Sequence, residues 1–148
     1  MKKLAIIAIL ATMAAAASAT DIGLRVGRNA GTETNNAGVT VGQSFGTFGA
    51  EAAFDRSTVG AVNVDRYSLL GSYEVAKVAG ASVALKAGAA FINPAAGKDG
   101  YAGLVGVGVS YPVAKNIKLV ADYAYQEGQD RVRGYNGNTV SAGVKYSF

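Results

Sequence analysis

The side chains of this 148-residue chain that could act as nucleophiles or general bases are few, because the sequence contains neither histidine nor cysteine. Serine nucleophiles are ordinarily activated by a histidine with a carboxylate behind it. A Ser–Lys pair stays formally open, since Lys86 and Lys145 fall on the same predicted face as Ser68, Ser82 and Ser141. The spacing favours none of these pairs. We therefore predict no catalytic residue and no enzymatic activity.

Metal and cofactor sites have equally little support. Glu51 and Asp55 lie two pleats apart on one face of a predicted strand, but transition metals prefer His or Cys ligands. A calcium site would need more oxygen ligands than this pair supplies. The glycine-rich stretch 103–108 lies inside a predicted strand, whereas a phosphate-binding loop joins a strand to a helix. We predict no metal and no cofactor.

Charged side chains do occur in the middle of predicted strands, and all of them fall on one face. Three are basic and three are acidic: Arg25, Glu51, Glu74, Lys86, Asp122 and Lys145. Buried charges are tolerated when they are paired and hydrogen-bonded. The balance of signs therefore predicts an internal network of ion pairs.

The elements that must position these charges are strands. Apolar residues alternate with small or polar ones, which indicates strands with two different faces. The pattern recurs in eight segments, several of them close to the 9–11 residues that a tilted strand needs to cross a membrane. The segments are 21–28, 37–45, 48–55, 66–75, 81–92, 101–111, 118–126 and 138–148.

The composition of the two faces favours a barrel in a membrane. The apolar face carries no charge within the strand cores, and the polar face is mostly glycine, alanine and serine. A soluble barrel would need a far more charged exterior. Links after the second, fourth and sixth segments are short, whereas 29–36, 56–65, 93–100 and 127–137 form longer polar links, as in transmembrane barrels. We predict an all-β fold: an eight-stranded antiparallel up-and-down transmembrane β-barrel, closed because lipid leaves no partner for a free sheet edge.

The first nineteen residues have the composition of a secretory signal peptide. Lys2 and Lys3 precede an apolar run, and Ala17 and Ala19 are the small residues expected at the cleavage site. We predict a signal peptide at 1–19 and a barrel domain at 20–148. Without Lys2 and Lys3, twelve basic residues face ten acidic ones, so the mature charge is +2. That charge is too small to indicate a nucleic-acid partner.

The last strand resembles the C-terminal strand of outer-membrane β-barrel proteins. Its alternate residues are Val140, Ala142, Val144, Tyr146 and Phe148, and the preceding stretch 111–119 is similar to the last periplasmic turn of that group. The chain resembles the family of eight-stranded barrels of the OmpA and OmpX type within the porin-like superfamily. This resemblance implies an outer-membrane location reached through the periplasm. It also implies that Val144, Tyr146 and Phe148 form a recognition signal for the barrel-assembly machinery.

Three functions remain open. The first is a monomeric barrel with a structural or surface-interaction role, in contact with outer-membrane lipids and lipopolysaccharide. The second is a narrow passive pore, and the third is a soluble periplasmic carrier. In the last long link, Asp130, Arg131, Arg133 and Tyr135 could bind lipopolysaccharide phosphates. The preferred alternative for that link is a solvated hairpin loop.

Overall fold

The computed structural model describes residues 20–148, and eight strands hold almost all of them. No helix in this part of the chain is long and apolar enough to span a bilayer. The predicted signal peptide, with Ala17 and Ala19, lies outside the described residues. The strands are β1 (Thr20–Asn29), β2 (Thr34–Phe45), β3 (Phe48–Val59), β4 (Val62–Val78), β5 (Ala81–Pro94), β6 (Gly100–Ala114), β7 (Ile117–Gly128) and β8 (Gly137–Ser147).

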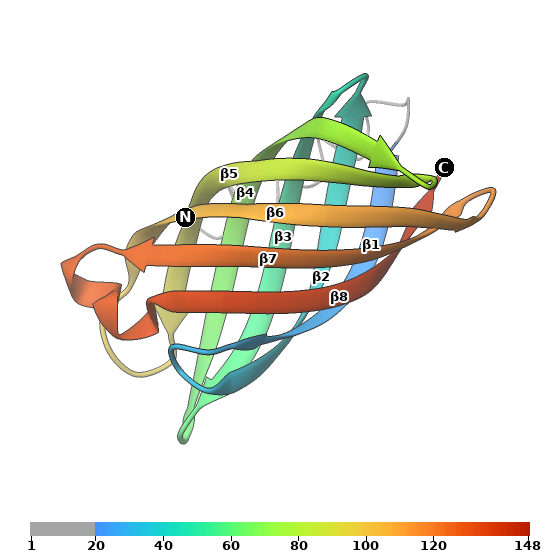
Figure 1. Cartoon of the computed structure of the whole chain (residues 1–148). Helices are drawn as coiled ribbons and strands as arrows, with labels where there is room; N and C mark the ends of the chain where they lie inside the picture. The colour runs from blue at the N-terminus through green and yellow to red at the C-terminus, as the bar shows by residue number, and fades with distance from the viewer. Residues whose placement is uncertain (1–19) are drawn as a thin grey trace.

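Each strand pairs antiparallel with the next, and β8 pairs with β1 to close the barrel (Figure 1). The predicted eight-stranded antiparallel up-and-down β-barrel is thereby confirmed. All eight predicted segments lie within these strands, apart from the final residue, Phe148. The alternation located the strands because successive side chains of a strand point to opposite sides of the sheet.

The predicted long links are too long at both ends, because strand residues continue into each of them, and in the link 56–65 eight of the ten residues belong to β3 or β4. β3 and β4 stay paired as far as Val59 and Val62, which leaves a turn of only two residues, with Gly60 at a φ of 62°. Cross-strand contacts join Arg56 to Asp65 in this extension. The alternation of apolar side chains ends with the apolar surface, whereas backbone hydrogen bonds between strands continue wherever the two chains stay side by side.

The outer surface of the barrel is apolar and uncovered. Leu24, Val105 and Val140 keep between 57% and 68% of their surface exposed, far more than expected for side chains of a soluble core. Aromatic side chains gather toward the two ends of this surface. The ring centroids of Phe54 and Tyr67 lie 5.1 Å apart near the loop end. Phe48 and Tyr73 pair near the end with the short turns, an arrangement typical of the two membrane–water interfaces.

Candidate functional site: the charged barrel interior

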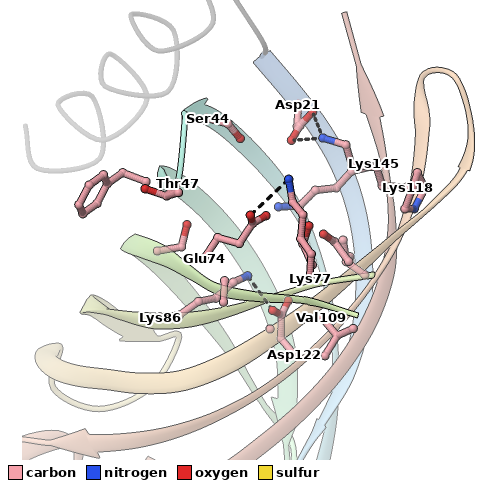
Figure 2. A pocket seen from close by; sticks show the side chains of 18 of the residues that line it. Asp21, Ser44, Thr47, Glu74, Lys77, Lys86, Val109, Lys118, Asp122 and Lys145 are labelled. Atoms are coloured by element: carbon pink, nitrogen blue, oxygen red, sulfur yellow. Dashed lines mark hydrogen bonds and ion pairs between the residues drawn. The ribbon is translucent and has the colours of Figure 1, made fainter. Parts of the chain in front are cut away.

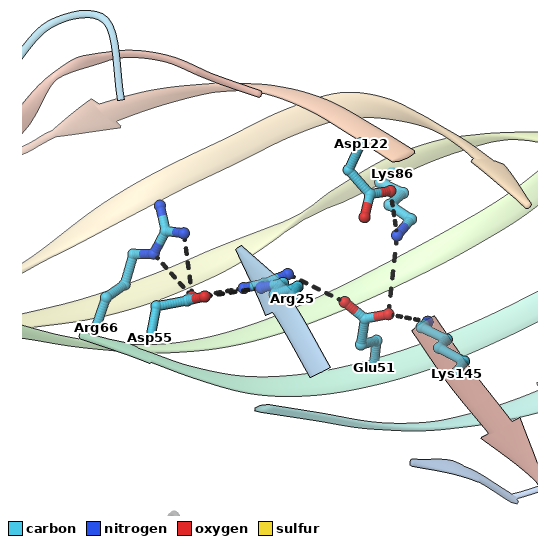
Figure 3. Close-up of polar contacts among 7 residues, drawn as sticks. All are labelled: Arg25, Glu51, Asp55, Arg66, Lys86, Asp122 and Lys145. Atoms are coloured by element: carbon cyan, nitrogen blue, oxygen red, sulfur yellow. Dashed lines mark hydrogen bonds and ion pairs between the residues drawn. The ribbon is translucent and has the colours of Figure 1, made fainter. Parts of the chain in front are cut away.

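Charged side chains from six strands meet inside the barrel and form one connected network (Figure 3). The interior charge network consists of Arg25 on β1, Glu51 and Asp55 on β3, Arg66 on β4, Lys86 on β5, Asp122 on β7 and Lys145 on β8. No side chain in it has more than 15% of its surface exposed. Four positive and three negative charges are therefore held together away from bulk water.

Asp55 is bound between two guanidinium groups. Arg25 Nε donates to Asp55 Oδ1 at 2.7 Å, and Arg66 donates to Asp55 Oδ2 from Nη2 at 3.1 Å and from Nε at 3.2 Å. Arg66 Nη1 also donates to Gln126 Oε1 at 3.2 Å. Such bidentate, charge-assisted bonds are directional and comparatively strong. They tie β1, β3, β4 and β7 together across the lumen.

Glu51 is the second centre of the network. It accepts a hydrogen bond from Lys145, and it lies 3.4 Å from Arg25 Nη1 and 3.8 Å from Lys86 Nζ. Lys86 makes its closer contact with Asp122, at 2.6 Å. Each basic group therefore has a carboxylate partner, and the network continues from the loop half of the barrel to its middle.

The two strands that bring no charge to the network, β2 and β6, face it with glycine. A Cβ on Gly108 of β6 would stand 2.8 Å from Cε of Lys86 and would also meet the Asp122 carboxylate. Gly38 of β2 lies in the same way against Asp55. An eight-stranded barrel has room for few large side chains, so glycine on these strands makes space for the ion pairs.

Of the six predicted network residues, the structure brings together Arg25, Glu51, Lys86, Asp122 and Lys145. Glu74 is not part of the network. It sits beside the β-bulge of β4, near the short turns, where its carboxylate lies 3.4 Å from the exposed Lys77. The bulge and the distance along β4 direct Glu74 to the rim instead of the centre.

Asp55 and Arg66 belong to the network although they are not among the six predicted residues. The apolar alternation ends near both residues, so it predicts strand ends there and not a place in the interior. The signal that could have found them is parity: Asp55 is two residues from Ala53 and four from Glu51 on one face of β3. Asp55 and Arg66 also carry opposite charges and lie directly opposite each other on β3 and β4, which completes that signal.

On the side of the short turns, the network borders an open cavity of about 470 Å³ (Figure 2). Lys77, Lys86, Lys118 and Lys145 line it together with the carboxylates of Asp21, Glu74 and Asp122. Further toward the loop end, two cavities that adjoin Arg66 hold only about 30 Å³ each, roughly one water molecule. The interior is therefore hollow at one end and filled in the middle.

The loop end is closed by an apolar cap from the 3-10 helix η1 (Asp130–Tyr135). Val132 is completely buried against Val64, Ile92 and Ala102, while Arg131 and Arg133 point outward with exposed side chains. The hypothesis of a solvated hairpin loop is therefore wrong for Val132. Two loop contacts fix the segment: Gln126 Nε2 donates to the Tyr135 carbonyl at 2.7 Å, and Gly128 N donates to Asn136 Oδ1 at 2.6 Å.

The described residues contain no cluster of three potential metal ligands.

At the C-terminal strand, Val144 pairs with Leu24 of β1, and Tyr146 with Ile22. All three residues of the predicted assembly signal face outward, with Phe148 72% exposed and its ring 5.0 Å from that of Tyr146. They therefore add little to the interior and lie at the seam where the barrel closes.

Comparison with known proteins shows a likeness of fold. No family model matches the chain, and no curated protein matches it in sequence. Among solved structures, the chain is similar to the N-terminal β-barrel domain of Pseudomonas aeruginosa OprF, with a TM-score of 0.67 and 17% identity over 88% of this chain and 97% of that one. It is similar to Neisserial surface protein A, with a TM-score of 0.65 and 15% identity over 88% and 95% of the two chains.

It also resembles the attachment invasion locus protein Ail of Yersinia pestis, an outer-membrane protein, with a TM-score of 0.59 and 12% identity over 89% of this chain and the whole of that one. A designed transmembrane β-barrel matches with a TM-score of 0.59 and 16% identity over 88% and 95% of the two chains. These identities are too low to carry a shared function. The chain has the fold of the eight-stranded outer-membrane β-barrels.

Proposed function

We propose that this protein is an outer-membrane barrel that does not conduct and does not catalyse, and that acts through its structure or its exposed loops. The observation that carries the proposal is the closed interior: the interior charge network fills the middle of the barrel and Val132 seals the loop end. The fold neighbours are outer-membrane proteins, which supports the location. In this reading the protein is a monomer in contact with outer-membrane lipids.

A soluble carrier would place its apolar face toward the ligand and its polar face toward water. Here the arrangement is inverted, with ion pairs inside and exposed leucine, valine and tyrosine side chains outside. That inversion supports the membrane location over the carrier function.

The test combines location with conductance. The expressed protein is expected in the outer-membrane fraction, where the unboiled form migrates differently on a gel from the boiled form. The same folded protein, inserted in planar bilayers, is expected to give no steady current. Recovery in the soluble periplasm would overturn the location, and steady channels from the native protein would overturn the closed state.

A narrow pore is the second candidate, because the 470 Å³ cavity reaches the network from one rim. If the ion pairs are what blocks that path, the combined variant Glu51→Ala, Lys86→Ala, Asp122→Ala and Lys145→Ala should raise the conductance. The rim pair gives the matched control, Glu74→Ala with Lys77→Ala, which should leave it unchanged. Unchanged conductance in the fourfold variant would show that these ion pairs are not what blocks the path.

A further inference from the structure

The lipid-facing wall has one sector that differs from the rest at the loop end. In register across β3, β4, β5 and β6, that wall carries a row of aromatic side chains, Phe54, Tyr67, Phe91 and Tyr101. The neighbouring sector on β8, β1 and β2 carries no aromatic residue at this end. Its outward residues are the small apolar side chains Val26, Ala37, Val140 and Ala142. A gap is thus left in the aromatic belt.

A shallow hollow of about 980 Å³ lies over this sector. Val26, Ala37, Val140 and Ala142 contribute its apolar lining, and Arg28 and Arg56 lie at its loop end. Glu33 supplies the carboxylate of this lining, which has a net charge of +1, while Asp65 lies outside the lining and pairs with Arg56. An apolar floor below a basic rim matches a lipid whose chains lie on the wall and whose headgroup is anionic.

Both arginines have guanidinium N–H groups that could donate hydrogen bonds to a ligand. Arg28 is exposed and makes no hydrogen bond or ion pair with the part of the chain that the structure describes. Arg56 donates to Asp65 from Nε at 2.7 Å and from Nη2 at 3.1 Å, which leaves Nη1 without a protein partner in these contacts. Its guanidinium also lies 5.8 Å from the ring centre of Phe54. Arg56 is therefore held in place beside the hollow, with 59% of its side chain exposed.

The spacing of the arginines indicates the headgroup. Arg28 is opposite Asn35 and Arg56 is opposite Ala37, so the two lie on either side of β2 and two residues apart along it. Strand spacings of about 4.8 Å and a rise of about 3.4 Å per residue put their Cα atoms about 12 Å apart. Two cations at that distance suit two phosphates of one headgroup better than a single phosphate, and arginine binds phosphate well.

We propose that this hollow binds the lipid portion of lipopolysaccharide, with phosphates at Arg28 and Arg56 and an acyl chain over Val26, Ala37 and Ala142. The inference rests on the proposed outer-membrane function, with the loop end facing the outer leaflet. It places the lipid on the barrel wall and not at Arg131 and Arg133 of η1, the alternative that the sequence left open.

The test is lipid binding by the folded protein in neutral detergent micelles, measured by native mass spectrometry with lipid A carrying two phosphates. Arg28→Gln with Arg56→Gln is expected to weaken binding at least about tenfold, as the loss of two charge-assisted contacts would. Arg131→Gln with Arg133→Gln removes the same charge and should leave binding unchanged. Ala37→Phe should weaken it by filling the hollow, and Glu33→Gln should strengthen it.

Equal binding by the Arg28/Arg56 variant and the wild type would overturn the proposal. Equal binding of dephosphorylated lipid A would do so too, as would equally tight binding of phosphatidylglycerol, which carries one phosphate. The gel shift of the unboiled protein is measured on every variant. A barrel that is folded and in the membrane but fails these tests contradicts only the lipid site, whereas a protein in the soluble fraction contradicts the proposed function itself.

Discussion

At the scale of single residues, Asp55 has the most demanding environment in the barrel. Its side chain is 2% exposed, and two arginines from different strands bind it. Removing one partner of a buried pair leaves the other charges without compensation, and this cost exceeds what the intact pair contributes to stability. An exposed ion pair is different, because water replaces the lost partner. The pair between Arg56 and Asp65 provides that contrast on the same two strands.

Asp55→Asn should therefore lower the free energy of unfolding by about 3 kcal/mol, because Arg25 and Arg66 would remain buried with reduced compensation. Asp65→Asn should lower it by no more than about 1 kcal/mol. Urea unfolding of the protein in phospholipid vesicles measures both changes. Equal losses in the two variants would show that the interior charge network is solvated like the surface.

At the scale of elements, β2 and β6 contribute no charge to the interior charge network, but their glycines leave space for it. Gly108 faces the Lys86–Asp122 pair and has no room for a side chain, whereas a Cβ on Gly103 of the same strand would meet nothing within 4 Å. The two glycines share a strand and differ in what surrounds them. A comparison of the two thus separates crowding of the ion pair from the general effect of replacing a strand glycine.

Gly108→Val is expected to cost about 2 kcal/mol of stability, the usual range for forcing an extra group into a filled interior. Gly103→Val should change stability little, since valine suits a strand and its side chain would face outward. Both are measured by the same unfolding titration. Similar behaviour of the two variants would mean that the ion pair can move aside freely.

The second element with a clear task is η1, whose Val132 closes the loop end. Gly100 and Gly128 make the space for it, since a Cβ on either residue would approach Val132 side-chain atoms to 2.9 Å or less. Hydrogen bonds from Gln126 and Gly128 also hold the segment, but Val132 is its completely buried apolar side chain. Local opening of such a segment costs far less than unfolding the barrel.

Val132→Asn should favour the open segment, because the burial of a valine contributes roughly 1.5–3 kcal/mol. Trypsin cleavage after Arg131 and Arg133 should then be at least about tenfold faster in the folded protein. Val78→Asn is the control, since Val78 is 63% exposed at the opposite end. Unchanged cleavage in Val132→Asn would show that the cap does not depend on Val132.

At the scale of the whole molecule, closure of the barrel joins the two ends of the described chain. β1 and β8 pair along their length, and the amide of Phe148 donates to the carbonyl of Thr20 at 3.1 Å. The outward side chains at this seam contribute little to packing, since Phe148 is 72% exposed. The resemblance to outer-membrane proteins predicts that these residues are recognised during assembly, and stability and assembly can be measured separately.

Phe148→Ala should reduce the amount of barrel that reaches the outer membrane in cells, because the residue proposed to be recognised by the assembly machinery is lost. The purified variant should refold in vesicles with a stability within about 0.5 kcal/mol of the wild type, as for an exposed substitution. Full assembly in cells would contradict the recognition role. Failure to refold alone would show that Phe148 is needed for the barrel itself.

The amino-acid sequence by itself determined the class of fold, the number of strands and the face of each strand. These follow from local rules, since alternation of side chains depends only on neighbouring residues and on the contrast between lipid and a polar interior. It also identified five of the interior charges, because the position of a charged residue in an alternating segment determines which face of the strand it lies on. The length of the strands beyond the apolar surface left no such local signal.

The tertiary structure decided which charges meet and what closes the barrel. Arg66 is the cross-strand partner of Asp55, but it also reaches Gln126 on β7, sixty residues further along the chain. That contact depends on the register across the closed sheet, which is a property of all eight strands together. Nothing in the sequence distinguishes Val132 from any other valine in a predicted loop. It is buried because η1 folds over the mouth that the closed barrel creates, and that mouth exists only once the last strand has paired with the first.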